Sequence, residues 1–248
     1  MRFRGENPVY KNYGQSYGLE GSNDYAASYG GVFRKTTLLL LLTGLIAYYV
    51  GTLNTIDFTM GTLIFGMIVS PILAYIMVIL AHRNVAMSFM YTILYAIFEG
   101  VFLGLLTMLV ASFTEGPIVL YALAGTFSTV FVMLLVYMSG IVNVNERFKG
   151  FLMTAFGAMF LLVIVYLIGS LTGLFTFAGS LTFYMTIIVF SIFVSTMYLL
   201  YDFNRVKEMV ESGVDKQYEW SLSLGLIVVI VWLYIDILRL LAIIMNRD

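Results

Sequence analysis

The 248-residue sequence contains no cysteine, and charged residues make up only 11% of it. The absence of cysteine excludes disulfide bonds, thiol nucleophiles and thiolate metal sites. A soluble domain normally carries charge on about a quarter of its residues, so this chain lacks the charge to cover a water-facing surface. Its net charge of −1 also excludes the broad basic field that nucleic-acid binding needs.

Several features of catalytic sites are missing as well. The single histidine, His82, cannot form a metal cluster alone, and no span contains a histidine for a protease mechanism. No glycine-rich loop of the GxxxxGK type is present to bind phosphate. The five lysines all fall outside the expected membrane spans, which excludes a Schiff base on a buried lysine. The sequence therefore predicts a protein that is not an enzyme and that has no cofactor.

What the chain has in abundance is apolar sequence, which makes up 61% of the residues at a mean hydropathy of +0.95. A helix needs about 20 apolar residues to cross the hydrocarbon core of a membrane. Seven segments satisfy this requirement: 36–53, 58–81, 86–111, 117–141, 150–174, 179–201 and 221–245. The sequence predicts an all-α integral membrane protein, a bundle of seven transmembrane helices with the lipid bilayer as its main partner.

The first 31 residues are of a different kind, rich in tyrosine, glycine, asparagine and serine. They lack the apolar core of a signal peptide. They also lack the apolar area that would order them, so we expect a flexible cytosolic tail over 1–31. Residues 32–248 then form a single transmembrane domain.

Lysine and arginine are distributed very unevenly between the two sides of the predicted bundle. Eleven fall on the side of the N-terminus: Arg2, Arg4, Lys11, Arg34, Lys35, Arg83, Arg147, Lys149, Arg205, Lys207 and Lys216. The other side has Arg247 alone, and Arg239 lies within the last span. Because loops rich in these residues stay in the cytosol, we expect a cytosolic N-terminus and, after seven crossings, a C-terminus outside.

Ionisable side chains inside the spans are the candidate functional residues, because each is costly to place in lipid. They are Glu99 in the third span, Asp202 at the end of the sixth, and Asp236 and Arg239 in the seventh. Three carboxyl groups and almost no base favour a cation or proton site over an anion site. Carboxylate oxygens also suit calcium, which makes Asp202 and Asp236 candidate calcium ligands. Two carboxylates held close together cannot both ionise cheaply, so such a pair would share a proton and respond to pH.

Structural interpretations of the same residues remain open. Asp236 and Arg239 are three residues apart on one helical face and can form a local ion pair. Asp202 can cap backbone groups at the cytosolic boundary. Glu99 can be protonated and hydrogen-bonded to a neighbouring helix, which avoids the cost of a buried charge.

Glycines beside Glu99 suggest where the third span packs. Gly100 and Gly104 form a small-residue stripe, which lets another helix approach closely. We expect the third span to pack on the seventh, with Glu99 facing the interior near Asp236 or Arg239.

Three strings suggest a family: YDFNRVK over 201–207, WLYIDILRLL over 232–241, and EGVFLG over 99–104. They resemble the Bax inhibitor family, also called the transmembrane Bax inhibitor motif proteins, in its bacterial branch. The resemblance covers essentially the whole chain from the first span onward. It implies a bacterial cell membrane protein whose C-terminal helix is central, with the other six wrapped around it.

The resemblance also implies a function, a calcium leak that responds to pH. Two aspartates on the last two helices share a proton and govern opening, and their positions match Asp202 and Asp236. Calcium and protons are then the small partners. Family members also carry basic residues where the second helix leaves the membrane, one of them a proposed latch on the aspartates. Here His82 and Arg83 occupy that stretch.

The linker between the two aspartates is longer here than the resemblance implies. If the last helix enters the membrane at Trp220, Asp236 lies about 24 Å along it at 1.5 Å per residue. The dyad forms if part of 216–226 is a cytosolic extension of the helix. Otherwise the alternative partners of Asp202 are Glu219 and Arg205. Those of Asp236 are Glu99 and Arg239.

Two further functions compete with a cation leak. One is a membrane protein without transport activity that regulates a partner, such as a membrane protease or a stress or death factor. Intramembrane acids favour the leak, while helix surfaces and the tail leave a membrane protein partner open. The other is a proton-coupled transporter, which ranks lower because no inverted repeat is evident.

Overall fold

The structure is a computed structural model that describes residues 26–52, 59–114, 117–172 and 181–245. The described residues form seven α-helices and one short 3₁₀ helix, η3 (Val85–Met87). The α-helices are α2 (Tyr29–Thr52), α3 (Met60–Arg83), α4 (Ser88–Ala111), α5 (Ile118–Met138), α6 (Glu146–Thr172), α7 (Leu181–Glu211) and α8 (Tyr218–Met245). Seven helices are long and apolar enough to cross a membrane, and no strand is found in the described ranges. This confirms the predicted all-α, seven-span architecture.

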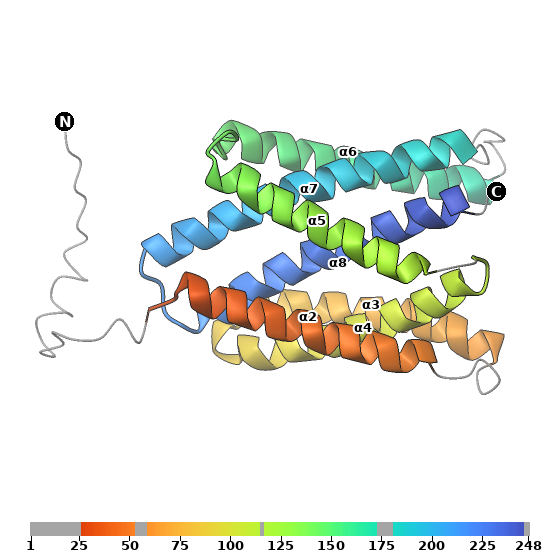
Figure 1. Cartoon of the computed structure of the whole chain (residues 1–248), viewed down its shortest axis with the longest axis horizontal. Coiled ribbons are helices and arrows are strands. Elements are labelled where there is room, and N and C mark those ends of the chain that lie inside the picture. Colours follow the sequence, from red (N-terminus) through yellow and green to blue (C-terminus); the bar gives the residue numbers. More distant parts are fainter. Residues whose placement is uncertain (1–25, 53–58, 115–116, 173–180, 246–248) are drawn as a thin grey trace, which may run out of the picture.

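The C-terminal helix α8 is the centre of the bundle. It lies between a group made of α2, α3 and α4 and a second group made of α5, α6 and α7 (Figure 1). It packs against α2, α4, α5 and α7, and its leucines and isoleucines join both clusters of the apolar core. A helix that is apolar on all sides is expected at such a position. The central place implied for this helix is confirmed.

Helix α2 begins earlier than the sequence suggested. It starts at Tyr29, where the predicted span started at residue 36, so residues 29–31 are helical although they were assigned to the tail. The Ser28 hydroxyl accepts a hydrogen bond from the Gly31 amide at 3.0 Å, as an N-capping serine does. Lys35 therefore lies within the helix, in its second turn. The rest of the predicted tail, residues 1–25, lies outside the described residues.

Helix α7 continues to Glu211, ten residues beyond the predicted end at 201. The added turns are polar and are supported by a hydrogen bond from Asn204 Nδ2 to Glu208 Oε1 at 2.7 Å. The helix stops before Gly213, whose φ of +71° is the left-handed conformation that commonly ends helices. Asp202 consequently lies within the helix and caps nothing at its end.

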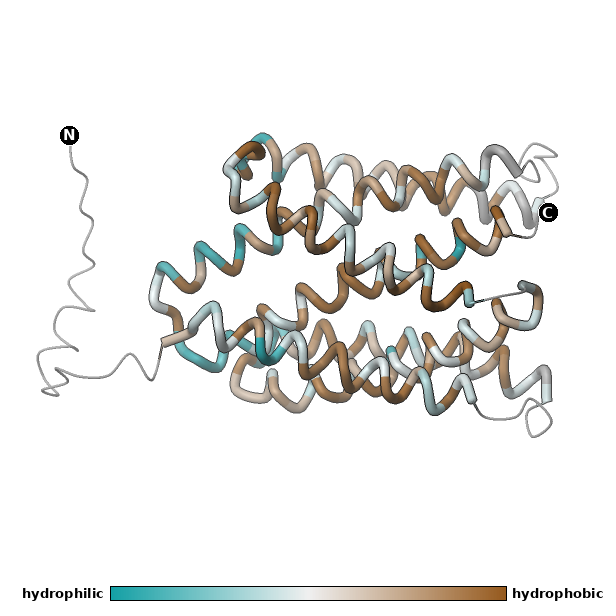
Figure 2. Tube along the Cα trace, viewed as in Figure 1, coloured by the Kyte–Doolittle hydropathy of each residue, from teal (hydrophilic) through white to brown (hydrophobic). Residues whose placement is uncertain are grey.

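Apolar residues run along the length of the helices, and hydrophilic residues gather at one end of the bundle, where α7 ends and α8 begins (Figure 2). Large apolar side chains such as Phe33, Tyr48 and Met138 are exposed, as expected of side chains that face lipid. The described basic residues lie at the helix ends on the side where α2 starts, with the exception of Arg239 in α8. This end of the bundle is called the basic end below. Arg247 lies outside the described residues.

Candidate functional site

Asp236 lies at the interface of α7 and α8 and is held by a serine. Its side chain is only 3% exposed, and its Oδ2 accepts a hydrogen bond from the Ser191 hydroxyl of α7. Trp232, one turn before Asp236, donates from Nε1 to Ser191 Oγ at 3.1 Å. The aspartate, serine and tryptophan thus form one hydrogen-bonded chain across the two helices.

Asp202 lies at the same interface, opposite a glycine. A Cβ atom placed on Gly225 of α8 would lie 3.7 Å from Asp202 Oδ1, so the missing side chain at Gly225 leaves room for the carboxyl group. Asp202 is 7% exposed and makes no side-chain hydrogen bond or ion pair within the described part of the chain. On α7 the buried Ser191, Ser195 and Asp202 follow one another at i, i+4 and i+11, which is a single face of a helix. This face is called the polar stripe of α7 below.

The two aspartates do not meet. Asp202 of α7 lies level with Gly225 of α8, and Ser191 of α7 lies level with Asp236 of α8. Both pairs fit the same antiparallel alignment of the two helices. Eleven residues separate the two levels on each helix, which is about 16 Å at 1.5 Å per residue. The shared proton implied by the family resemblance therefore has no geometric basis here. The two carboxyl groups do not form one calcium ligand set, and no cluster of three metal-ligating side chains occurs among the described residues.

Asp236 and Arg239 do not pair either, because they face different surroundings. Asp236 points into the α7 interface, whereas Arg239 is exposed and has no salt bridge to Asp236 in the described ranges. Three residues along a helix leave a rotation of about 60° between two side chains, enough to separate interior from surface. Arg239 lies six residues before Met245, the last residue of α8, and its long side chain can extend to the membrane surface.

Glu99 faces the interior, as predicted, with 8% exposure. The glycines beside it do not contact α8, however. A Cβ on Gly100 would lie 2.9 Å from the Thr43 carbonyl oxygen, and one on Gly104 would overlap α2 as well. Thr43 also donates from its hydroxyl to the Ala96 carbonyl at 3.3 Å. The small-residue stripe of the third span therefore packs on the first span. The third span also packs on the seventh, as predicted, but not through these glycines.

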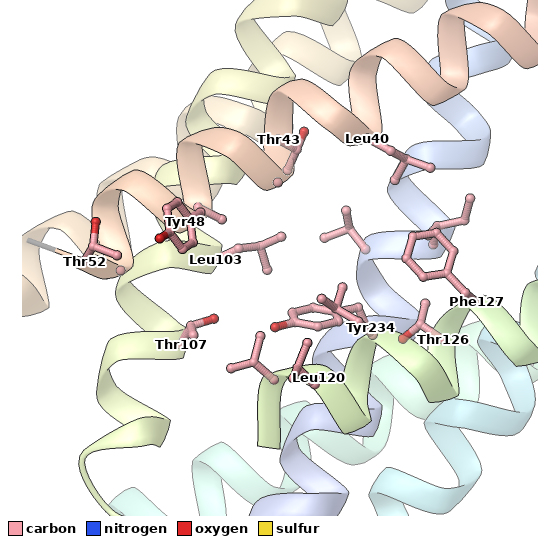
Figure 3. A pocket seen from close by; sticks show the side chains of 17 residues that line it. Leu40, Thr43, Tyr48, Thr52, Leu103, Thr107, Leu120, Thr126, Phe127 and Tyr234 are labelled. Carbon is pink, nitrogen blue, oxygen red and sulfur yellow. The ribbon is translucent and has the colours of Figure 1, made fainter. Parts of the chain in front are cut away.

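Helices α4 and α8 do touch, and their register places Glu99 away from Asp236. The side chains of Thr107 and Tyr234 point toward one another across the two helices, which shows how α4 and α8 are aligned (Figure 3). Eight residues earlier on each helix, Glu99 lies near the level of Leu226. Asp236 is ten residues further along α8, about 15 Å away. Glu99 is thus closer in depth to Asp202, which faces the neighbouring Gly225, than to Asp236 or Arg239.

Glu219, a candidate partner of Asp202, binds Lys35 instead. Lys35 Nζ lies 2.6 Å from Glu219 Oε2, and Glu219 Oε1 accepts from the amide and the hydroxyl of Ser28 at 2.8 and 3.0 Å. The ammonium group also lies 4.8 Å from the ring centroid of Trp220, within the range of a cation–π contact. Glu219 is 1% exposed in the first turn of α8, where a negative charge is favoured. We call the Lys35–Glu219–Ser28 group the buried clasp. Arg205, the other candidate, is half-buried one turn after Asp202 on α7.

The proposed latch residues lie apart from the aspartates. His82 and Arg83 are exposed at the end of α3, and His82 Nδ1 lies 2.8 Å from the Val78 carbonyl oxygen of its own helix. In the described ranges α3 packs on α4, touches α8 and makes no extensive contact with α7. No latch contact to Asp202 is formed in this structure.

Sequence reasoning missed Ser191 and Lys35. Ser191 carried a usable signal, because it stands four residues before Ser195 and eleven before Asp202, so the three share a face of the sixth span. Nothing in the sequence indicated that Lys35 would be partnered, since a lysine directly before an apolar run is typical of a solvated flank.

Residues 7–246 match the model of a protein family described as Bax inhibitor 1 like. The match covers nearly the whole chain, all seven helices included. A search among curated proteins gave no match.

Proposed function

Because the chain belongs to the Bax inhibitor 1-like family and buries Glu99, Asp202 and Asp236 in its membrane helices, we propose that it is a pH-sensitive cation leak channel, with calcium as its principal ion. The polar stripe of α7 is the observation that carries this proposal. It places Asp202, Ser195 and Ser191 on one buried face, and Asp236 continues the line from α8. A line of acids and hydroxyls through an apolar bundle is costly and is typical of an ion or proton pathway.

The geometry supports two successive stations rather than one dyad. Asp202 lies toward the basic end of the bundle, and Asp236 lies about three helical turns further along. When ionised, each carboxylate attracts a cation, and serine hydroxyls supply further oxygen ligands of the kind that calcium prefers. When protonated, each loses its charge and the attraction is lost. Both carboxyl groups are buried in this structure, as we expect of a closed path.

Calcium uptake into liposomes that contain the purified protein tests the proposal. Wild-type flux should rise from about pH 5 to about pH 8, as carboxyl groups ionise. Asp236→Asn cannot ionise, so its flux at the alkaline end should fall to the level that the wild type shows at the acidic end. Asp202→Asn and Glu99→Gln should flatten the same pH profile. Glu146→Gln removes an exposed carboxylate at the end of α6 and should change nothing.

The opposite results would be informative. An unaltered pH profile in both aspartate variants would exclude the two-station pathway. Wild-type protein that is folded and correctly inserted but carries no cation at any pH would favour the alternative, a regulator of a membrane protein partner.

The distribution of basic residues supports one orientation in the membrane. We expect the basic end of the bundle, with the N-terminus, to lie in the cytosol and the C-terminus to lie on the other side. A cytosol-active reporter should therefore work when fused before Met1 and fail when fused after Asp248, and an exported reporter should do the reverse. Equal readings at both ends would mean an even number of crossings.

A further inference from the structure

A second feature of the bundle lies apart from the acidic helix interface. A cavity of about 490 Å³ is enclosed by side chains from α2, α4, α5 and α8 (Figure 3). None of its lining residues carries a charge, and none belongs to α7. The acids of the proposed leak lie elsewhere, because this lining contains no carboxylate. The cavity is therefore separate from the proposed leak.

Three of the four threonine hydroxyl groups around the cavity donate to backbone carbonyls. Thr43 donates to the Ala96 carbonyl at 3.3 Å, and Thr126 donates to the Ala122 carbonyl at 2.8 Å. Tyr234 and Thr107 point toward one another in Figure 3. Most of the remaining surface offered to a ligand is hydrocarbon. A polar or charged ligand would lose its hydration there without gaining partners.

The cavity opens sideways, toward the lipid. Helices α2 and α5 both pack on α8 but hardly on each other, which leaves a gap between them. Exposed side chains border this gap, among them Tyr48, Leu120 and Phe127. Val231 and Tyr234, which are 4% and 7% exposed, form part of the back wall on α8. A molecule can therefore enter from the bilayer without crossing water.

The length of the cavity matches one leaflet of a membrane. Its lining on α2 runs from Leu40 to Thr52, which is twelve residues and about 18 Å at 1.5 Å per residue. Half of a hydrocarbon core of about 30 Å is about 15 Å. Thr52 is the last residue of α2, so the cavity starts at the membrane surface and ends near the middle of the bilayer.

We infer that this cavity is a binding site for a single acyl chain of a membrane phospholipid, from the leaflet at the Thr52 end of α2. The chain lies parallel to the helices, enters between α2 and α5 and reaches α8. The lipid headgroup stays outside, near the end of α2. The bound acyl chain fills the gap between α2 and α5, which hardly contact each other.

Photolabelling of the full-length protein tests this inference. The probe is a phosphatidylcholine with a diazirine in the middle of one acyl chain, mixed into liposomes that hold the protein. Lipid at the outer surface can label only exposed residues, whereas a chain in the cavity should also label Val231 and Tyr234. Labels on these two buried residues, mapped by mass spectrometry, are the expected result.

A matched pair of glycine variants sharpens the test. Gly44 lines the cavity, and a Cβ atom placed on it meets nothing within 4 Å, so Gly44→Phe should add a ring at the cavity without a clash at its first carbon. Gly157 on α6 is equally open and lies elsewhere, so Gly157→Phe is the control. We expect Gly44→Phe to lower labelling of the buried wall on the order of tenfold, equivalent to about 1.4 kcal/mol of binding free energy, and Gly157→Phe to leave it unchanged.

Three results would overturn the inference. Wild-type protein labelled only on exposed residues would show that no acyl chain enters, whatever the variants do. Equal labelling of the buried wall in Gly44→Phe would show that the label does not report on this cavity. Cross-links from Tyr48 to a second copy of the chain, with no lipid label on Val231, would show that a protein partner occupies the cavity.

Discussion

Replacing Lys35 with methionine should lower the free energy of unfolding by about 3–5 kcal/mol, the usual cost of leaving one member of a buried ion pair without its partner. The pair is short, with Lys35 Nζ 2.6 Å from Glu219 Oε2, and Glu219 is 1% exposed. Methionine retains most of the apolar stem and removes the ammonium group, with its bond to Glu219 and its contact with the Trp220 ring. Unfolding by a denaturing detergent, followed by circular dichroism, gives the change in free energy.

The rest of the buried clasp explains why water cannot replace the ammonium group. Gly31 lies directly against the Glu219 carboxylate, so closely that a Cβ atom there would overlap it. Ser28 occupies Oε1 through its amide and its hydroxyl, which leaves Oε2 to Lys35 alone. Loss of Lys35 therefore leaves one oxygen of a carboxylate buried without a donor.

Two further variants separate this effect from a general loss of charge. Lys149→Met removes an exposed pair to Glu146, and such pairs contribute about 0–1 kcal/mol. Glu219→Gln in the Lys35→Met protein removes the orphaned charge while keeping an acceptor for Ser28, so the double variant should regain part of the loss. Equal losses for Lys35→Met and Lys149→Met would show that the clasp contributes nothing special.

The membrane spans were predictable because an apolar run of about 20 residues has one stable arrangement in lipid. The ends of the helices were not, because polar residues can continue a helix beyond the membrane. In α7 the polar turns after Asp202 are held by Asn204 and Glu208, and Glu208 Oε1 also lies 3.7 Å from Lys149 Nζ of α6. Gly213 was the available signal for the end of α7, but the apolar run that defined the predicted span ended well before this glycine.

The candidate acids were found from sequence, but their partners were not. An ionisable residue in a span is conspicuous, whereas the serine that binds Asp236 is one of many hydroxyl residues in the chain. Partners across helices depend on register, and the register of α7 against α8 follows from the length of α7 and the short turn at 212–217. Neither quantity could be read from hydropathy. The proton-sharing dyad failed for this reason, and so did the local Asp236–Arg239 pair.

The glycines at 100 and 104 show the same limit, because a small-residue stripe predicts close approach and does not name the helix that approaches. The approach itself is real. A Cβ atom placed on Gly104 would lie 2.6 Å from Val50 Cβ and 2.8 Å from the Ala47 carbonyl oxygen, both on α2. Those distances are shorter than van der Waals contact, and backbone oxygen cannot move away as a flexible side chain can.

Gly104→Leu should therefore lower the free energy of unfolding by about 3 kcal/mol, the upper part of the range for overpacked interiors. Helix α2 must shift away from α4 to admit the new side chain, which also strains the Thr43–Ala96 hydrogen bond. Gly104→Ala adds the single clashing carbon and should cost less. Detergent-induced unfolding again measures the difference.

Gly157→Leu is the control for this prediction, because its Cβ meets nothing within 4 Å and it carries the same change in helix propensity. It should leave stability unchanged or raise it by up to about 1 kcal/mol. If Gly104→Leu behaves like Gly157→Leu, α2 does not lie against α4 as closely as the structure shows. A loss of stability in Gly104→Leu alone would instead show that close contact between α2 and α4 stabilises the part of the bundle that contains Glu99.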